Sequence, residues 1–422
     1  MTQRLLMLCP FWPPLGGPGV QRVAKFARYL PDHGIQPCVV TRADRQEEDA
    51  TLAGEVSSVA VHEAFHIPFQ RLGQNSGNGQ PGARRFARLK QVRDWMQVPD
   101  HAVTWVPFAV ATAARLIRQD RPTALYTTSP YHSTHLAGLL LKQMFGIPWI
   151  ADFRDPWAGD AFTNYPTEWH RRANARLEAG VLGQADCVVV VSEAMREDLQ
   201  HRYPDLSTAV KVIYNGFDPD DFEGLDSVAP PAGPPWTLRH LGTLYTNRRP
   251  DVFLEGLAAF FAARPDREKR FRVEFYGHLH ADVAARLARW RERISPTALQ
   301  FHPYVSHTEA LRLARSSHAL LLIPGPGKST VTGKIFEYLA TGRPILAVAP
   351  EPSGIDEVLS SVKNHPLRVP ESPDQVCRAL ESLEAHLEAG NADELAHAPE
   401  VAAAFSRPAG AAQLARIIRD IA

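Results

Sequence analysis

The 422-residue sequence contains no uninterrupted apolar run of the ~18 residues that a membrane-spanning helix needs. The first residues are not followed by the apolar core of a signal peptide. Lys plus Arg number 46 and Asp plus Glu number 46, so no basic excess points to nucleic acid. We therefore expect a cytoplasmic protein that does not bind nucleic acid.

Cysteine is scarce. The four cysteines, Cys9, Cys38, Cys187 and Cys377, are scattered and show no metal-ligand spacing. Most of them lie in apolar runs, which is typical of buried free thiols in a reducing compartment. The sequence thus predicts neither a structural metal nor a bound cofactor.

Two nucleotide fingerprints are missing as well. No G-x-G-x-x-G follows the first apolar run, and the second run ends at Thr41-Arg42 without the acid that a nicotinamide dinucleotide site needs. Residues 325–330 resemble the end of a P-loop, but Leu322 stands where its first Gly belongs. A nicotinamide oxidoreductase and a Walker-type nucleotidase are both disfavoured.

What is present is an alternation of short apolar runs with helical patterns, which is typical of βαβ units and parallel sheets. The predicted strands are 5–9, 37–41, 124–128, 148–152, 187–192, 211–214, 237–241, 272–276, 319–323 and 344–348. The predicted helices include 20–30, 132–145, 168–182, 194–201 and 411–422. We expect two doubly wound, Rossmann-like α/β domains that face each other across a cleft.

A stretch rich in Asp, Pro and Gly, 216–235, separates two such series. The boundaries expected from it are an N-terminal domain over 1–220, a linker over 221–235 and a C-terminal domain over 236–404. The remaining segment, 405–422, is expected to form a helix that packs back on the N-terminal domain.

Within the first domain, residues 73–97 break the alternation. A Gly-rich loop precedes a basic amphipathic segment that carries Arg84, Arg85, Arg88, Lys90 and Arg93. Such a segment suits an anionic membrane surface or a pyrophosphate, and a solvated helix face explains it equally well. Peripheral contact with the inner membrane face is one of these open interpretations.

Glycine-rich and polar segments follow several predicted strands, at the edge where open α/β sheets bind ligands. After the first strand, Gly16 and Gly17 would allow the backbone to approach a substrate closely, although a structural turn is the alternative. After the strand 124–128, His132 opens a helix and is a candidate for contact with a sugar hydroxyl or a phosphate. His135, one turn later, is expected to pack, and without a third ligand the pair does not predict a metal site.

The segment 151–157 places Asp152 and Asp155 around Arg154. Asp152 is a candidate for orienting an acceptor hydroxyl, and Asp155 is expected to hold the loop in shape. The alternative is an Arg–Asp pair with a structural role only. In the second half, Arg248 follows the strand 237–241, and its planar donors match phosphate geometry.

The segment 333–346 is the most informative part of the chain. Gly333 and Lys334 open a short amphipathic helix, and Glu337 lies one turn further on the same side. A helix N-terminus and a lysine suit a diphosphate, while a carboxylate beyond them suits a pair of ribose hydroxyls. This segment predicts a nucleotide diphosphate site.

Together these motifs resemble the retaining glycosyltransferases of family 4, which have the GT-B fold. The resemblance covers nearly the whole chain and is most specific in residues 11–17, 150–157, 191–195, 214–218 and 333–346. It implies transfer of a sugar from a UDP- or GDP-sugar to a glycan or lipid-linked acceptor, in surface polysaccharide or glycolipid synthesis, with retention and without a metal. The resemblance also implies that the N-terminal domain is the acceptor side and that the C-terminal domain binds the nucleotide sugar.

The resemblance also implies roles for individual residues. Gly16 and Gly17 match a loop near the donor phosphate and acceptor, Lys334 matches the diphosphate site, and Glu337 matches the second acid of a Glu-x7-Glu motif that binds ribose. The first acid of that motif falls at Ser329. Thr243 stands where an Arg is usual, so Arg248 would supply the basic partner.

These assignments give a set of candidates. The catalytic candidates are His132, Arg248 and Lys334, and the substrate-binding candidates are Gly16, Gly17, Asp152, Thr243, Gly333 and Glu337. A sugar-nucleotide epimerase or isomerase on the same scaffold and a non-catalytic nucleotide-sugar-binding protein are the alternatives. The first needs paired acid/base carboxylates, and no convincing pair is evident.

Overall fold

The computed structural model describes residues 3–16, 18–43, 50–67, 98–159, 165–244, 250–325, 331–362, 367–396 and 399–422. Four of the sequence predictions fall outside these residues. They concern Gly17, Arg248, Ser329 and the basic segment 84–93.

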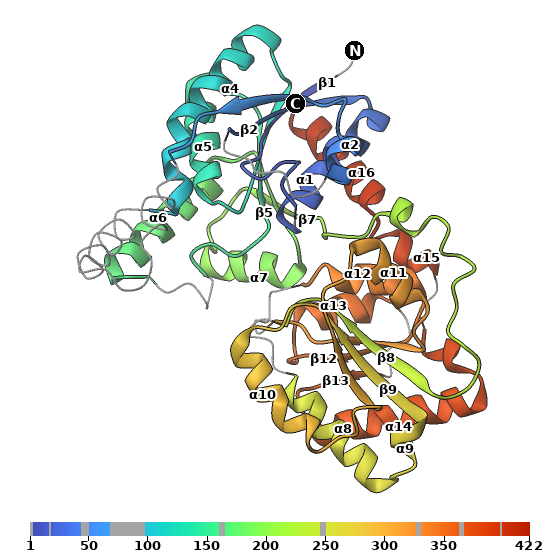
Figure 1. Ribbon diagram of the computed structural model, residues 1–422. Helices are drawn as coiled ribbons and strands as arrows, with labels where there is room; N and C mark the ends of the chain where they lie inside the picture. The colour runs from blue at the N-terminus through green and yellow to red at the C-terminus, as the bar shows by residue number, and fades with distance from the viewer. Residues whose placement is uncertain are drawn as a thin grey trace, which may run out of the picture. The chain divides into compact units, whose positions relative to one another are not determined.

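The chain forms two compact units (Figure 1). Unit 1 comprises Met1–Val191, Met195–Tyr214 and Gly410–Ala422, and unit 2 comprises Ser192–Ala194 and Asn215–Ala409. The last segment of the chain therefore belongs to unit 1, although it follows unit 2 in sequence.

Unit 1 contains a parallel sheet with the strand order β3-β2-β1-β4-β5-β6-β7. Its strands are β1 (Gln3–Leu8), β2 (Ile35–Arg42), β3 (Ala60–Ala64), β4 (Ala124–Thr128), β5 (Trp149–Phe153), β6 (Cys187–Val190) and β7 (Ala209–Val212). The central strands β4, β5 and β6 are buried along their whole length. Such uniform burial is expected of a parallel sheet with helices on both faces, and it explains their continuous apolar runs.

Helices cover both faces of this sheet (Figure 1). They are α1 (Pro18–Tyr29), η1 (Leu30–His33), α2 (Ala50–Glu55), η3 (His101–Trp105), α4 (Val106–Asp120), α5 (Ser133–Phe145), α6 (Glu168–Gln184), α7 (Glu193–Arg202) and α16 (Arg407–Ile421). One apolar core joins the sheet to α4, α5 and α6, and a second joins it to α1 and α16. Ala411, Leu414 and Ile418 of α16 are fully buried in the second core.

Unit 2 repeats the architecture with a parallel sheet in the order β10-β9-β8-β11-β12-β13. The strands are β8 (Trp236–Leu241), β9 (Phe271–Tyr276), β10 (Leu299–His302), β11 (Ala319–Leu322), β12 (Ile345–Val348) and β13 (Arg368–Val369). The helices are η4 (Pro219–Phe222), α8 (Asp251–Ala263), α9 (Arg267–Arg270), α10 (Ala281–Arg291), α11 (His307–Arg315), α12 (Lys334–Thr341), α13 (Gly354–Ser361), α14 (Pro373–Ala389), η5 (Ala392–Leu395) and α15 (Pro399–Ala403).

The predicted class, α/β with two doubly wound parallel sheets, is confirmed. The strands β3, β10 and β13 were not predicted. All three lie at sheet edges, where the sequence mixes polar and apolar residues or the strand is very short. None of the described helices is both long enough and apolar enough to cross a membrane.

Candidate functional site

A cavity of about 150 Å³ opens in unit 2 at the carboxyl ends of β8 and β9. Its lining comes from these strand ends, from the segment that precedes α11, and from α11 and α12. The lining residues are Leu241, Gly242, Tyr276, Gly277, Tyr304, Val305, His307, Ala310, Leu311, Ala314, Lys334, Glu337 and Tyr338. In an open α/β sheet this edge is where ligands bind.

Two glycines shape the floor of the cavity. Gly242 follows β8 with φ of 140°, and Gly277 follows β9 with φ of 138°. A Cβ on Gly242 would lie 2.0 Å from Nζ and 2.1 Å from Cε of Lys334, and a Cβ on Gly277 would lie 2.6 Å from the carbonyl carbon of Gly242. Only glycine therefore allows the two strand ends and the lysine to approach so closely.

The helix α12 presents Lys334 and Glu337 to this cavity. Its apolar face is buried in unit 2, and its first turn follows Gly333, which serves as the N-cap. The Tyr338 hydroxyl accepts a hydrogen bond of 2.9 Å from the backbone N–H of Leu241, so the helix is fastened to the end of β8. Lys334 and Glu337, three residues apart, then lie on one side as the sequence predicted.

The carboxylate of Glu337 has a partner that the sequence analysis missed. The Oε1 atom of Glu337 lies 3.2 Å from Nε2 of His307, the first residue of α11. On its other side, Nδ1 of His307 lies 4.0 Å from Oδ2 of Asp221 in η4. The signal for His307 was weak because α11 follows β10, a strand that the sequence did not reveal.

Thr243 lies directly after Gly242 and is half-buried. Its backbone nitrogen would lie 3.0 Å from a Cβ on Gly277, so Thr243 is part of the region where the ends of β8 and β9 lie against each other. Its role with a substrate stays a prediction.

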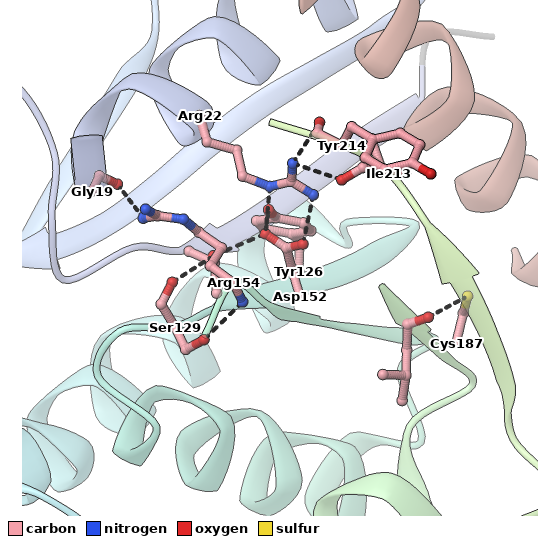
Figure 2. A network of polar contacts seen from close by, with 11 residues as sticks. Gly19, Arg22, Tyr126, Ser129, Asp152, Arg154, Cys187, Ile213 and Tyr214 are labelled. Carbon is pink, nitrogen blue, oxygen red and sulfur yellow. Dashed lines mark hydrogen bonds and ion pairs between the residues drawn. The ribbon is translucent and has the colours of Figure 1, made fainter. Parts of the chain in front are cut away.

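Unit 1 has its own polar network at the corresponding edge, and this network is buried (Figure 2). The guanidinium of Arg22 donates to both oxygens of Asp152 over 3.0 and 2.8 Å and also to the carbonyls of Ile213 and Tyr214. The hydroxyl of Tyr126 donates to the same carboxylate over 2.5 Å, and that of Thr128 over 2.9 Å. The network thus joins α1, β4, β5 and the segment after β7.

The electrostatics of this network favour a permanently charged pair. Burial alone would raise the pKa of Asp152, but the Arg22 guanidinium and the donating hydroxyls outweigh it, so that pKa lies below the usual range. Both side chains are 0% exposed. Asp152 was expected to orient an acceptor hydroxyl; the structure instead encloses it among protein donors, where it holds β5 against α1.

Next to this pair, Arg154 ties the first turn of α1 to the loop after β5. Its guanidinium donates to the carbonyl of Gly19 over 2.7 Å, and its backbone N–H donates to Oγ of Ser129 over 3.1 Å. Burial lowers the pKa of Arg154 from its ordinary value. Gly16, three residues before Gly19, is half-buried, and its expected contact with a substrate stays a prediction.

The two histidines of α5 lie in different surroundings. His132 precedes the helix, is half-buried and stacks on Trp157, with ring centroids 5.0 Å apart. His135 is 0% exposed, stacks on Phe153, and lies 2.9 Å from the hydroxyl of Thr127. Burial and the neighbouring His132 lower the pKa of His135 to about 3. His135 is therefore a neutral packing residue, whereas the catalytic role of His132 stays a prediction.

Asp100 is a further polar residue that sequence reasoning missed. Its carboxylate accepts from the backbone N–H of Ser133 over 2.9 Å and from the Ser133 hydroxyl over 2.7 Å, at the start of α5. Burial raises its pKa despite these donors. No group of three His, Cys, Asp or Glu side chains among the described residues gathers as a metal site requires.

Residues 19–221, which comprise most of unit 1, match the family described as Glycosyltransferase Family 4. No curated protein sequence matches the chain.

Solved structures resemble the chain over its whole length. A glycosyltransferase from Rickettsia africae ESF-5 has 16% identity and a TM-score of 0.64, with 99% of this chain and 98% of that chain covered. Alr3699/HepE from Anabaena in complex with UDP has 15% identity and a TM-score of 0.63, with 99% and 100% covered. Sucrose-phosphate synthase from Thermosynechococcus elongatus has 15% identity and a TM-score of 0.62, with 99% and 98% covered. The fold of this chain is the GT-B fold of these neighbours.

Proposed function

We propose that this protein is a glycosyltransferase that moves a sugar from a UDP- or GDP-sugar to a hydroxyl of a glycan or lipid-linked acceptor. The observation that carries the proposal is the cavity of unit 2, where Lys334 packs on Gly242 and Glu337 lies one helical turn further. A cation and a carboxylate so arranged match a diphosphate and a ribose. The UDP held by the Anabaena neighbour and the family match of residues 19–221 support it.

The chemistry proposed is retaining transfer without a metal. The bond between the anomeric carbon and the diphosphate oxygen breaks while the acceptor oxygen bonds to the same face of that carbon. The acceptor proton passes to the departing phosphate oxygen. Lys334 stabilises the negative charge that develops on the diphosphate, because a preorganised ammonium group needs little reorganisation during the reaction.

The wider biological role is part of the proposal too. Synthesis of a cell-surface polysaccharide or glycolipid fits a lipid-linked acceptor, and the basic segment 84–93 would then bring the enzyme to the inner membrane face. Lipid vesicles with and without anionic lipid test that contact by cosedimentation of the full chain.

The function itself is tested by calorimetry with UDP, GDP and NAD, followed by incubation with the matching sugar nucleotides. We expect one nucleoside diphosphate to bind, NAD not to bind, and the matching donor to be hydrolysed slowly without an acceptor. The released sugar should keep the configuration of the donor. Binding without any turnover would favour a non-catalytic nucleotide-sugar-binding protein, and failure of both nucleotides to bind would overturn the proposal.

A further inference from the structure

His307 connects three separate elements of unit 2 at the rim of the cavity. It opens α11, its Nε2 lies 3.2 Å from Glu337 Oε1 on α12, and its Nδ1 lies 4.0 Å from Asp221 Oδ2 in η4. The side chains of His307 and Glu337 are 45% and 33% exposed and both line the cavity. The ring of His307 therefore lies between two carboxylates, that of Asp221 at 4.0 Å and that of Glu337, which is predicted to bind ribose, at 3.2 Å.

The contact leaves Glu337 able to bind a ligand. A carboxylate has two oxygens and about four lone-pair positions. His307 occupies one position on Oε1, so the other oxygen and the remaining lone pairs of Oε1 are not taken by this bond. Two neighbouring hydroxyls can therefore donate hydrogen bonds to the carboxylate of Glu337 while it stays in contact with His307.

The contact also limits the freedom of the glutamate. A Glu side chain that is one-third exposed loses rotamer entropy when a ligand fixes it. Ordering the side chain before the ligand arrives reduces this loss on binding, which is the general benefit of preorganisation.

We infer that His307 is a positioning residue that holds the Glu337 carboxylate for the ribose diol of the nucleotide. The inference rests on the proposed function, because it assigns a task within the same site. The alternative is that the exposed His307–Glu337 pair contributes nothing to binding, because many surface ion pairs contribute little free energy.

The test is calorimetric titration of the full chain with UDP and with 2′-deoxy-UDP, or with the guanosine pair if GDP is the nucleotide that binds. The variants are His307→Ala, His307→Gln, Glu337→Ala and the double variant. His386→Ala is the matched control, because His386 lies on α14 and does not line the cavity. The Gln side chain keeps an N–H donor near the place of Nε2.

We expect His307→Ala to weaken UDP binding about tenfold, because the rotamer entropy of Glu337 would then be lost on binding. Binding of 2′-deoxy-UDP should change by less than about threefold, since the missing hydroxyl has already removed the contact that His307 serves. His307→Gln should restore most of the UDP affinity. The double variant should bind no more weakly than Glu337→Ala, because the two residues act on one contact. With the donor sugar, KM should rise while kcat stays nearly constant.

Several results would overturn the inference while leaving the function intact. The first is an unchanged affinity of His307→Ala for UDP, the second an equal loss of affinity for UDP and 2′-deoxy-UDP, and the third additive losses in the double variant. In each case the wild-type chain would still bind the nucleotide, and Lys334→Ala would abolish that binding. Absence of nucleoside diphosphate binding by the wild-type chain would instead overturn the proposed function and this inference together.

Discussion

The two units place charged residues at the same edge of the same kind of sheet, yet they use them in opposite ways. In unit 1, Arg22 and Asp152 meet each other in the core and are both 0% exposed. In unit 2, Lys334 and Glu337 line a cavity, and the side chain of Glu337 is 33% exposed. The position after a parallel strand therefore identifies an edge that can bind a ligand, but burial decides whether a charge there binds a ligand or the protein itself.

The backbone explains part of this difference. In unit 2, Gly242 and Gly277 keep side-chain volume out of the strand ends, and space for a ligand remains. In unit 1, the ends of β4 and β5 carry Thr128, Asp152 and Phe153, and these side chains fill the space with hydrogen bonds and ring contacts. The first arrangement suits recognition, whereas the second suits rigidity.

The largest effect should come from breaking the buried pair. Arg22→Met keeps most of the side-chain volume but leaves the Asp152 carboxylate buried without its cation, which should lower the free energy of unfolding by about 3–5 kcal/mol. Urea unfolding followed by circular dichroism measures it. Arg4→Met, which removes an exposed pair with Asp120, should cost less than about 1 kcal/mol. Equal losses in the two variants would show that burial does not distinguish the pairs.

In unit 2, the loss of Lys334 should lower turnover rather than stability. Lys334→Ala removes the ammonium that we propose stabilises the departing diphosphate, so turnover should fall about 100- to 1,000-fold. Its unfolding midpoint should remain near that of the wild-type chain. Lys269→Ala, an exposed lysine of α9 in the same unit, is the control and should keep full turnover. Full activity in Lys334→Ala would contradict the diphosphate assignment.

A substitution of Gly242, which lines the cavity, should have a smaller effect. In Gly242→Ala the new methyl group would lie 2.0 Å from Lys334 Nζ, so the lysine must move and the backbone at φ of 140° becomes strained. Overpacking of this kind costs about 1–3 kcal/mol. If this cost falls on the position of Lys334, nucleotide affinity in calorimetry should fall roughly 5- to 150-fold. Gly180→Ala in α6, where a Cβ meets nothing within 4 Å, should leave the affinity unchanged. Normal nucleotide affinity in Gly242→Ala would refute this account of the floor.

The central part of the fold was predictable because burial on both faces gives strands a continuous apolar sequence. The predicted strand 124–128 coincides with β4, and the predicted strand 319–323 exceeds β11 by one residue. The edge strand β10, with the sequence LQFH, alternates too weakly to be recognised. Sequence periodicity reports burial, so strands at the edges of a sheet are the hardest to predict from it.

The candidate site also contains contacts that a local sequence pattern predicts and contacts that it does not. Lys334 and Glu337 could be predicted together because a helix fixes the geometry of residues three apart. The Arg22–Asp152 pair spans 130 positions of the sequence, and His307 and Glu337 are 30 positions apart on two helices. No local pattern encodes such pairs; they follow from the packing of elements. The sequence therefore predicted that Lys334 and Glu337 share one side of a helix and that Asp152 lies at a strand end, but it did not show that Asp152 is enclosed.

The last prediction uses pH to test whether the edge of unit 1 is closed to protons. The pKa of His135 is lowered to about 3 by burial and by His132, so the folded state resists a proton that the unfolded state accepts near pH 6.5. Stability should therefore be complete above pH 6.5 and fall as the pH decreases towards 3, with a loss of about 2 kcal/mol at pH 5. His135→Asn should remove that share of the loss in urea unfolding at pH 7 and pH 5, whereas His201→Asn, an exposed histidine of α7, should not. An unchanged pH dependence in His135→Asn would mean that the buried edge of unit 1 admits the proton, and the contrast between a closed edge and an open one would then be smaller than the structure indicates.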